Sequence, residues 1–116
     1  MTHTNWHNEE FMKGKHREVV RVASALKDDK IEFLEGVRAL RTLQFDVTRK
    51  DHDPDFLAFE AVYSVTDHIP EGLLRERCAS SFLEKCNNDV ERAKEAFGMR
   101  VKDACSRLIT RFSENA

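Results

Sequence analysis

The chain has 116 residues, of which 41% are hydrophobic and 34% are charged, with only four glycines and two prolines. This length indicates one domain that buries roughly two-thirds of its unfolded surface and needs no disulfide or metal to fold; the few glycines and prolines argue against a turn-rich β fold. The formal net charge is −2, and no window contains the basic stripe that is typical of a nucleic-acid binder.

Two amphipathic helices are predicted in the first half of the chain. The first spans about residues 8–26, follows a flexible terminus at 1–7 and can be interrupted at Gly14. After a turn and cap at Asp28-Asp29, the second spans about residues 30–44. The inward residues recur at three- and four-residue spacings. They are Phe11, Met12, Val19, Val22, Ala23 and Leu26 in the first helix, and Leu34, Val37, Leu40 and Leu43 in the second.

A shorter helix is predicted over about residues 54–65. Asp53 followed by Pro54 is typical of an N-cap and a first helical turn. The inward residues of this helix are Phe56, Phe59, Val62 and Tyr63. Residues 58–65 also favour a β-strand, but a lone strand would have no partner elsewhere in the chain. The strand is therefore the alternative.

Another helix is predicted over residues 73–85, with Pro70 before its first turn. The residues expected to face the core are Leu74, Cys78, Phe82 and Cys86. Asn87 and Asn88 should end it, because asparagine favours helix boundaries.

The last predicted helix spans about residues 88–112. Asn88 and Glu91 form a pair that is typical of a capping box, and Gly98 is a place where the helix can bend. Its apolar stripe consists of Val90, Ala93, Phe97, Val101, Ala104, Leu108 and Phe112. Together the five helices predict an all-α fold, an irregular bundle within the single domain 1–116.

Compartment is predicted from the cysteines and the first residues. Cys78, Cys86 and Cys105 are odd in number and have no CxxC spacing, which indicates reduced thiols. The first residues contain neither a cationic region nor an apolar one, and no apolar run approaches the ~20 residues of a membrane span. We therefore expect a cytoplasmic protein.

The charge is biased in one segment only, residues 46–71. This segment holds seven acidic and two basic residues, whereas residues 1–45 hold seven and eight and residues 72–116 hold seven and nine. A carboxylate-rich surface suits a basic partner, commonly a protein. Asp53 and Asp67 can instead cap helices, and some acids can pair with Arg75 or Arg77. The candidate partner-binding residues are Asp51, Asp55, Glu60, Asp67 and Glu71, most of which we expect to be exposed.

No catalytic, metal or cofactor site is predicted. His3 and His7 have a metal-ligand spacing but no nearby third ligand except Glu10. The run DHDPD at 51–55 lacks the glycine and glutamate of a calcium-binding EF-hand loop. Cys78 lies on an apolar stripe and is interpreted as a small buried hydrophobe. We expect neither an enzyme nor a protein that contacts nucleic acid.

A pattern of residues across about 30–112 resembles a bacterial family of small, all-helical, uncharacterised proteins. It consists of Asp53 to Phe56, Phe59, Val62, Ser64, Thr66, Asp67, Ile69, Pro70, Gly72 and Arg75, together with Leu34 to Arg38 and Ala104 to Ile109. Some members are immunity proteins of contact-dependent growth inhibition, which block an incoming toxin domain, often a nuclease, in the cytosol.

This resemblance implies an immunity protein that binds and blocks a cognate toxin domain. In that mechanism the carboxylates would occupy the basic cleft in which a nuclease binds phosphate, and electrostatic steering would speed association. The alternative is a helical adaptor or homodimer unrelated to toxins. Its contact surface would be the widest exposed apolar patch instead of the acidic segment.

Overall fold

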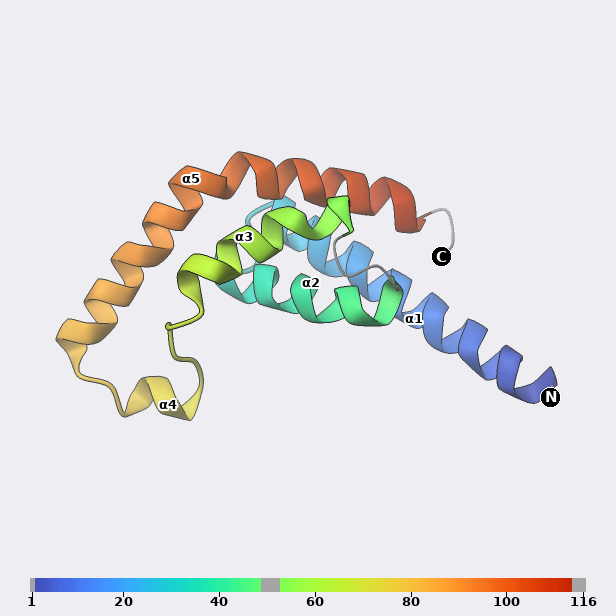
Figure 1. Cartoon of the computed structure of the whole chain (residues 1–116), viewed down its shortest axis with the longest axis horizontal. Coiled ribbons are helices and arrows are strands. Elements are labelled where there is room, and N and C mark those ends of the chain that lie inside the picture. The colour runs from blue at the N-terminus through green and yellow to red at the C-terminus, as the bar shows by residue number, and fades with distance from the viewer. Residues whose placement is uncertain (1, 49–52, 114–116) are drawn as a thin grey trace.

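The structure is a computed structural model that describes residues 2–48 and 53–113, with side chains from residue 9 onward. Within these residues it contains helices and no strand, which confirms the predicted all-α bundle (Figure 1). The elements are α1 (Thr2–Lys27), α2 (Phe33–Val47), the 3-10 turn η1 (Pro54–Phe56), α3 (Leu57–Thr66), α4 (Leu73–Glu76) and α5 (Ser80–Ser113).

The turn between α1 and α2 is the one predicted at Asp28-Asp29. Asp29 adopts a left-handed φ of 57°. The amide of Lys30 donates to the carbonyl of Ala25, and the amide of Asp29 donates to that of Leu26. This is the Schellman arrangement, which satisfies the last carbonyls of a helix and reverses the chain. It places α2 against α1.

The short helix after Asp53 is also confirmed, and the alternative of a β-strand over 58–65 is wrong. The Asp53 side chain accepts a hydrogen bond from the Asp55 amide at 3.0 Å and so caps η1. Phe56, Phe59 and Val62 recur every third residue and are fully buried. This spacing matches one face of a helix, so packing overrides the strand preference of the aromatic and β-branched residues.

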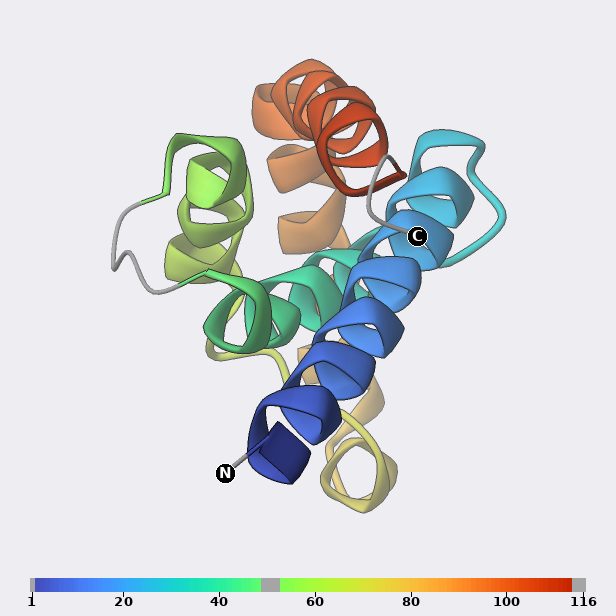
Figure 2. The ribbon, with the colours of Figure 1, turned by 90° about the vertical axis from the view of Figure 1, so that its right-hand side faces the viewer.

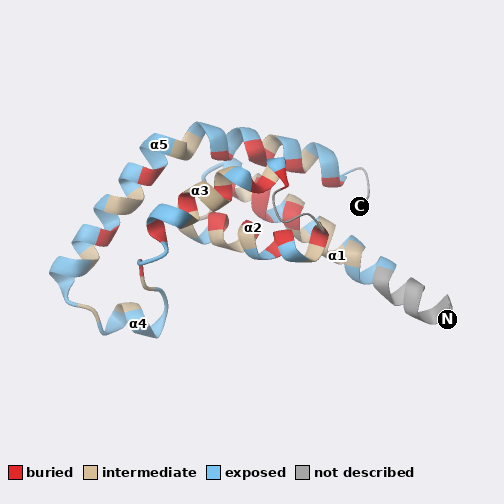
Figure 3. Cartoon of the chain, viewed as in Figure 1, coloured by how far each residue is buried: buried red, intermediate tan, exposed pale blue. Residues whose placement is uncertain are grey.

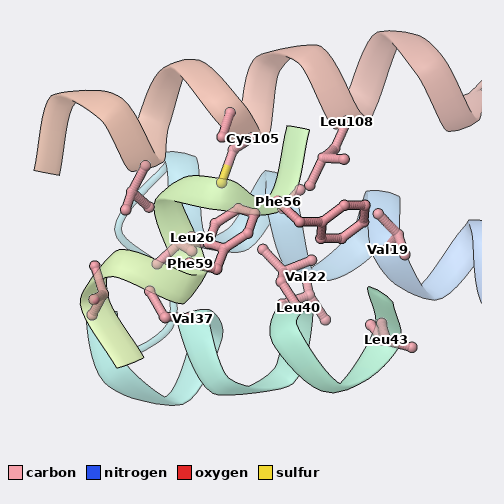
Figure 4. Packing of buried hydrophobic residues seen from close by; sticks show 14 of the residues in the cluster. Val19, Val22, Leu26, Val37, Leu40, Leu43, Phe56, Phe59, Cys105 and Leu108 are labelled. Atoms are coloured by element: carbon pink, nitrogen blue, oxygen red, sulfur yellow. The ribbon is translucent and has the colours of Figure 1, made fainter. Parts of the chain in front are cut away.

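Four helices surround one core. Viewed along the bundle, α1, α2, α3 and α5 lie around a common interior (Figure 2). Phe56 and Phe59 meet edge to face with ring centroids 6.0 Å apart. Phe56 lies between Leu40 of α2 and Leu108 of α5, and Phe59 lies between Val37 and Cys105 (Figure 4). Phe11, expected to face inward, is instead half-exposed, because the first turns of α1 project beyond the bundle (Figure 1).

The predicted helix boundary at Asn87 and Asn88 is wrong. One helix, α5, runs through both residues from Ser80 to Ser113. Both asparagines are exposed, and an exposed asparagine costs a helix only about 0.7 kcal/mol relative to alanine. The actual break lies at residues 77–79, between α4 and α5.

The predicted helix over 73–85 is correspondingly wrong in length and orientation. Its first part forms only the single turn α4, and Leu74 and Phe82 are exposed instead of facing the core. Cys78 is half-buried, whereas Cys86 is buried as expected. The exposed side chains lie on α4 and the first half of α5, which turns away from the bundle (Figures 1 and 3). We call residues 73–98 the arm.

Candidate functional site

Most carboxylates of the predicted acidic surface form ion pairs within the molecule. Five of the seven in residues 46–71 have a basic partner within 4.0 Å: Asp46 with Lys15, Asp53 with Arg111, Asp55 with Arg107 and Arg111, Glu60 with Arg41, and Glu71 with Arg38. None of these partners is Arg75 or Arg77, the two expected from the sequence. The charge bias of the segment is therefore largely neutralised by its neighbours in space.

Asp53 and Asp55 bind two arginines of α5. Arg111 donates to both oxygens of Asp53 and to Asp55, each at 3.0 Å, and Arg107 donates to Asp55 at 3.0 Å. The Thr48 hydroxyl also donates to Asp53, at 3.2 Å. These bonds attach η1 to the C-terminal end of α5. We call Thr48, Asp53, Asp55, Arg107 and Arg111 the Asp53 cluster.

The charge state of Asp53 is set by two opposing effects. The residue is only 3% exposed, and burial alone would raise its pKa. The Asp55 amide and the Arg111 guanidinium outweigh that effect and hold the pKa of Asp53 below its ordinary value of 3.8. Asp53 is therefore an ionised structural residue, which agrees with its predicted role as a cap.

The five candidate partner-binding residues do not form one anionic face. Asp51 lies outside the described residues. Asp55 and Glu60, expected to be exposed, are only partly exposed, because they bind arginines of α5 and α2 respectively. Glu71 is exposed as expected, and Asp67, for which a structural role was the alternative, is exposed too. Asp67 alone of the five is described without an ion pair, and it ends α3 as the C-cap residue.

Glu60 and Glu71 bind two arginines that lie three residues apart on α2. Arg41 lies 3.1 Å from Glu60 and stacks on the Tyr63 ring, 3.6 Å from its centroid. Arg38 donates to Glu71 at 3.0 Å and also to the carbonyls of Thr66 and Ile69. These two arginines attach α3 and the following loop to α2, so both carboxylates contribute to the fold.

A groove of about 1030 Å³ lies between the arm and the start of α2. Its walls come from residues 31–38, residues 69–75 and residues 87–102, and Leu26 and Val101 contribute at its base. Apolar side chains from each wall line it, among them Phe33, Ile69 and Val90. No pattern in the sequence predicts this groove.

Polar contacts fix the position of the loop between α3 and the arm. His68 lies 2.9 Å from Asp89 of α5. Arg75 donates to the Asn87 side chain at 3.1 Å. Together with the bonds from Arg38, these contacts hold residues 66–75 against both α2 and α5, so α4 projects at the edge of the groove in a defined position.

The arm exposes large apolar side chains. Leu73 and Leu74 are 75% and 69% exposed, Phe82 is also exposed within the arm, and Met99 is exposed one residue beyond it. Two other exposed aromatic residues differ, because Phe11 lies under Lys15 and Phe45 under Arg41. Exposed apolar side chains beside a groove are typical of a site of protein contact.

One sequence signal could have located the arm. Ser81 and Glu84 have the spacing of a capping box, within two residues of the observed start of α5 at Ser80. This pair predicts a helix start there and so a break after α4. The asparagine pair at 87–88 predicts a boundary as well, seven residues farther along the chain, and that one is wrong.

Among the described side chains, no group of three or more histidines, cysteines or acids lies together in a metal-binding arrangement. His3 and His7 lie outside the described side chains. Similarly, no described helix is long and apolar enough to span a bilayer.

No protein-family model matches the chain, and no curated protein or solved structure is significantly similar to it.

Proposed function

We propose that this chain is a non-enzymatic protein-binding protein whose contact surface is the arm and the groove beside it. The observation that carries the proposal is the exposure of Leu73 and Leu74 on a projecting turn. Burying such side chains against a partner is favourable by roughly 1.5–3 kcal/mol each. The geometry thus favours an apolar contact over the acidic one.

Ion pairs within the molecule argue against electrostatic steering of a basic toxin by an acidic surface. Steering by an acidic surface requires net charge, because the fields of paired opposite charges cancel within a short distance. The carboxylates of Asp53 and Asp55 are matched by the two guanidinium groups of Arg107 and Arg111. A basic toxin would therefore meet a nearly neutral surface at this cluster.

Immunity to a toxin domain is the second candidate function. It is favoured by the outer face of α3, where Leu57 and Val65 are each 47% exposed and the helix ends at Asp67, for which no ion pair is described. On this proposal the chain blocks a basic toxin, such as a nuclease, by covering its cleft with this face and the exposed Glu71. The resemblance in sequence pattern supports the same assignment.

Matched pairs of variants distinguish the two contact surfaces. Leu73→Ser with Leu74→Ser changes the arm, and Leu57→Ser with Val65→Ser changes α3 by the same chemistry. The protein should be titrated with itself and with the products of its neighbouring genes. If the proposed contact is correct, only the arm variant loses association. Equal binding by wild type and arm variant would exclude the arm.

The immunity candidate has its own test in toxin activity. A toxin domain encoded beside this chain should lose activity at equimolar protein, and the α3 variant should restore that activity. Asp67→Lys should slow association most at low salt, where charges are least screened. Toxin activity that is unchanged by the wild-type protein would rule out immunity against that toxin.

A further inference from the structure

We infer that the partner of the arm is a second copy of this chain, with α4 of each protomer inserted into the groove of the other. The inference rests on the proposed function, since it names the occupant of the same surface. Three features of the described residues support it: where α4 lies, what the groove presents, and which charges remain unpaired.

The α4 turn and the groove lie next to each other on the surface of the molecule. Gly72 and Arg75 line the groove, while Leu73 and Leu74, next to them in the chain, point away into solvent. A two-fold interface requires this arrangement, because each protomer must offer the same patch and receive its partner's. Because α4 and the groove lie side by side, a single two-fold rotation can place α4 of each protomer in the groove of the other.

The groove offers an apolar lining to an apolar insert. Phe33, Leu34 and Val90 are each only partly buried within the protomer, so they retain surface that two leucines can cover. The α4 turn is four residues long, and its two consecutive leucines are both exposed. A concave site of this size, lined by apolar and charged side chains, can hold such an insert.

Unpaired charges of opposite sign lie on the two surfaces, and each surface also carries one of the other sign, because Glu76 of α4 and Arg75 of the groove have no described ion pair. Three cations of the groove are matched within it: Arg38 by Glu71, Lys102 by Asp29, and Lys94 by Glu91. Glu32 and Glu35 also line the groove, and no ion pair is described for either. Arg77, exposed beside α4, likewise has no described ion pair. Insertion of α4 can bring Arg77 toward these glutamates, which would fix the register.

The test is the mass of the full chain in solution, measured by sedimentation equilibrium over a range of concentrations. The wild type should be a dimer. Leu73→Asp with Leu74→Asp should weaken dimerisation at least about a hundredfold, by burying two charges. Leu57→Asp with Val65→Asp, the same change on α3, should leave the dimer intact. Circular dichroism checks that each variant folds.

A charge exchange tests the register. Arg77→Glu and Glu35→Arg should each weaken the dimer about tenfold, and the two changes together should recover part of that loss. A wild-type chain that is monomeric at every soluble concentration overturns the inference, as does a dimer that the arm variant leaves unchanged. If the chain is a monomer but binds another protein through the arm, the proposed function stands and only the homodimer is excluded. If the arm variant binds every partner as tightly as the wild type does, both the proposed function and the homodimer are excluded.

Discussion

Asp53 is a buried, multiply hydrogen-bonded residue whose loss should lower the stability of the protein. It caps η1, accepts from Thr48 and binds Arg111, all while 3% exposed. We expect Asp53→Ala to lower the free energy of unfolding by about 2 kcal/mol, because the cap on the Asp55 amide is lost together with one of the two carboxylates that bind Arg111. Urea denaturation measures this. Asp67→Ala, at an exposed carboxylate, is the control and should change stability by less than about 0.5 kcal/mol.

His16 should make the stability depend on pH in the mildly acidic range. Burial and then the nearby Arg111 lower the pKa of His16 from 6.5, and its ring packs on Phe112 with centroids 4.8 Å apart. A lowered pKa means that the unfolded chain binds the proton more tightly. The stabilising effect is therefore complete above pH 6.5 and is lost as the pH falls through the folded pKa.

Melting temperatures measured from neutral to mildly acidic pH would test this. The wild type should become less stable over that range, and His16→Gln should have a flatter profile, because glutamine does not titrate. Identical slopes for the two proteins would show that His16 does not cause the loss. A separate loss of stability below pH 3.8 is expected from Asp53, whose lowered pKa has the same sign of effect.

At the level of single helices, two glycines should respond oppositely to alanine. A Cβ at Gly36 in α2 would lie 2.9 Å from Leu26 Cδ1 and 3.2 Å from Ile31 Cγ2. Leu26 is buried in the core and cannot move away freely. We expect Gly36→Ala to destabilise the protein by about 1–3 kcal/mol through overpacking.

Gly98 provides the matched comparison within α5. A Cβ there meets nothing within 4 Å, and alanine is the better helix former by about 1 kcal/mol. Gly98→Ala should therefore raise the free energy of unfolding by about 0.5–1 kcal/mol, measured by the same urea titration. If both substitutions destabilise, the open space at Gly98 is not available to a side chain.

The helices also show which elements could be predicted from residue spacing. α2 and α3 were predicted within a few residues, because their apolar stripes are buried and a cap or turn marks each start. α4 could not be predicted as a single exposed turn. Two consecutive leucines fit a helix that packs on the core as well as they fit an exposed turn. Leu73 and Leu74 are exposed because the tertiary fold places no other described segment over them.

For the molecule as a whole, the three thiols should differ in reactivity. Cys86 and Cys105 are buried, and burial raises the pKa of Cys105 to about 12. Cys78 is half-buried on the arm, where its thiol donates to the Leu74 carbonyl. At low protein concentration a disulfide reagent should modify one thiol quickly and all three after unfolding. Cys78→Ser should remove the fast phase, and a fast phase that persists would contradict this assignment.

The candidate site could be predicted less well than the fold, and the reason is distance along the chain. Arg107 and Arg111 are 52 and 58 residues from the carboxylates that they bind. A charge count over a local window cannot include such partners, so residues 46–71 resembled a free acidic surface. The groove likewise combines three separate segments, and no one of them indicates a hollow by itself.

The long-range pairs between the acidic segment and the arginines of α2 and α5 restrict how this chain can diverge. A substitution of Arg111 alone leaves the buried carboxylate of Asp53 without its arginine, while Asp55 keeps Arg107, and loss of Asp53 alone leaves Arg111 paired only with Asp55. In descendants of this sequence, the two positions should therefore change jointly or not at all. The same coupling should connect Arg38 with Glu71 and Arg41 with Glu60, so that covariation between distant positions records the way in which these helices are held together.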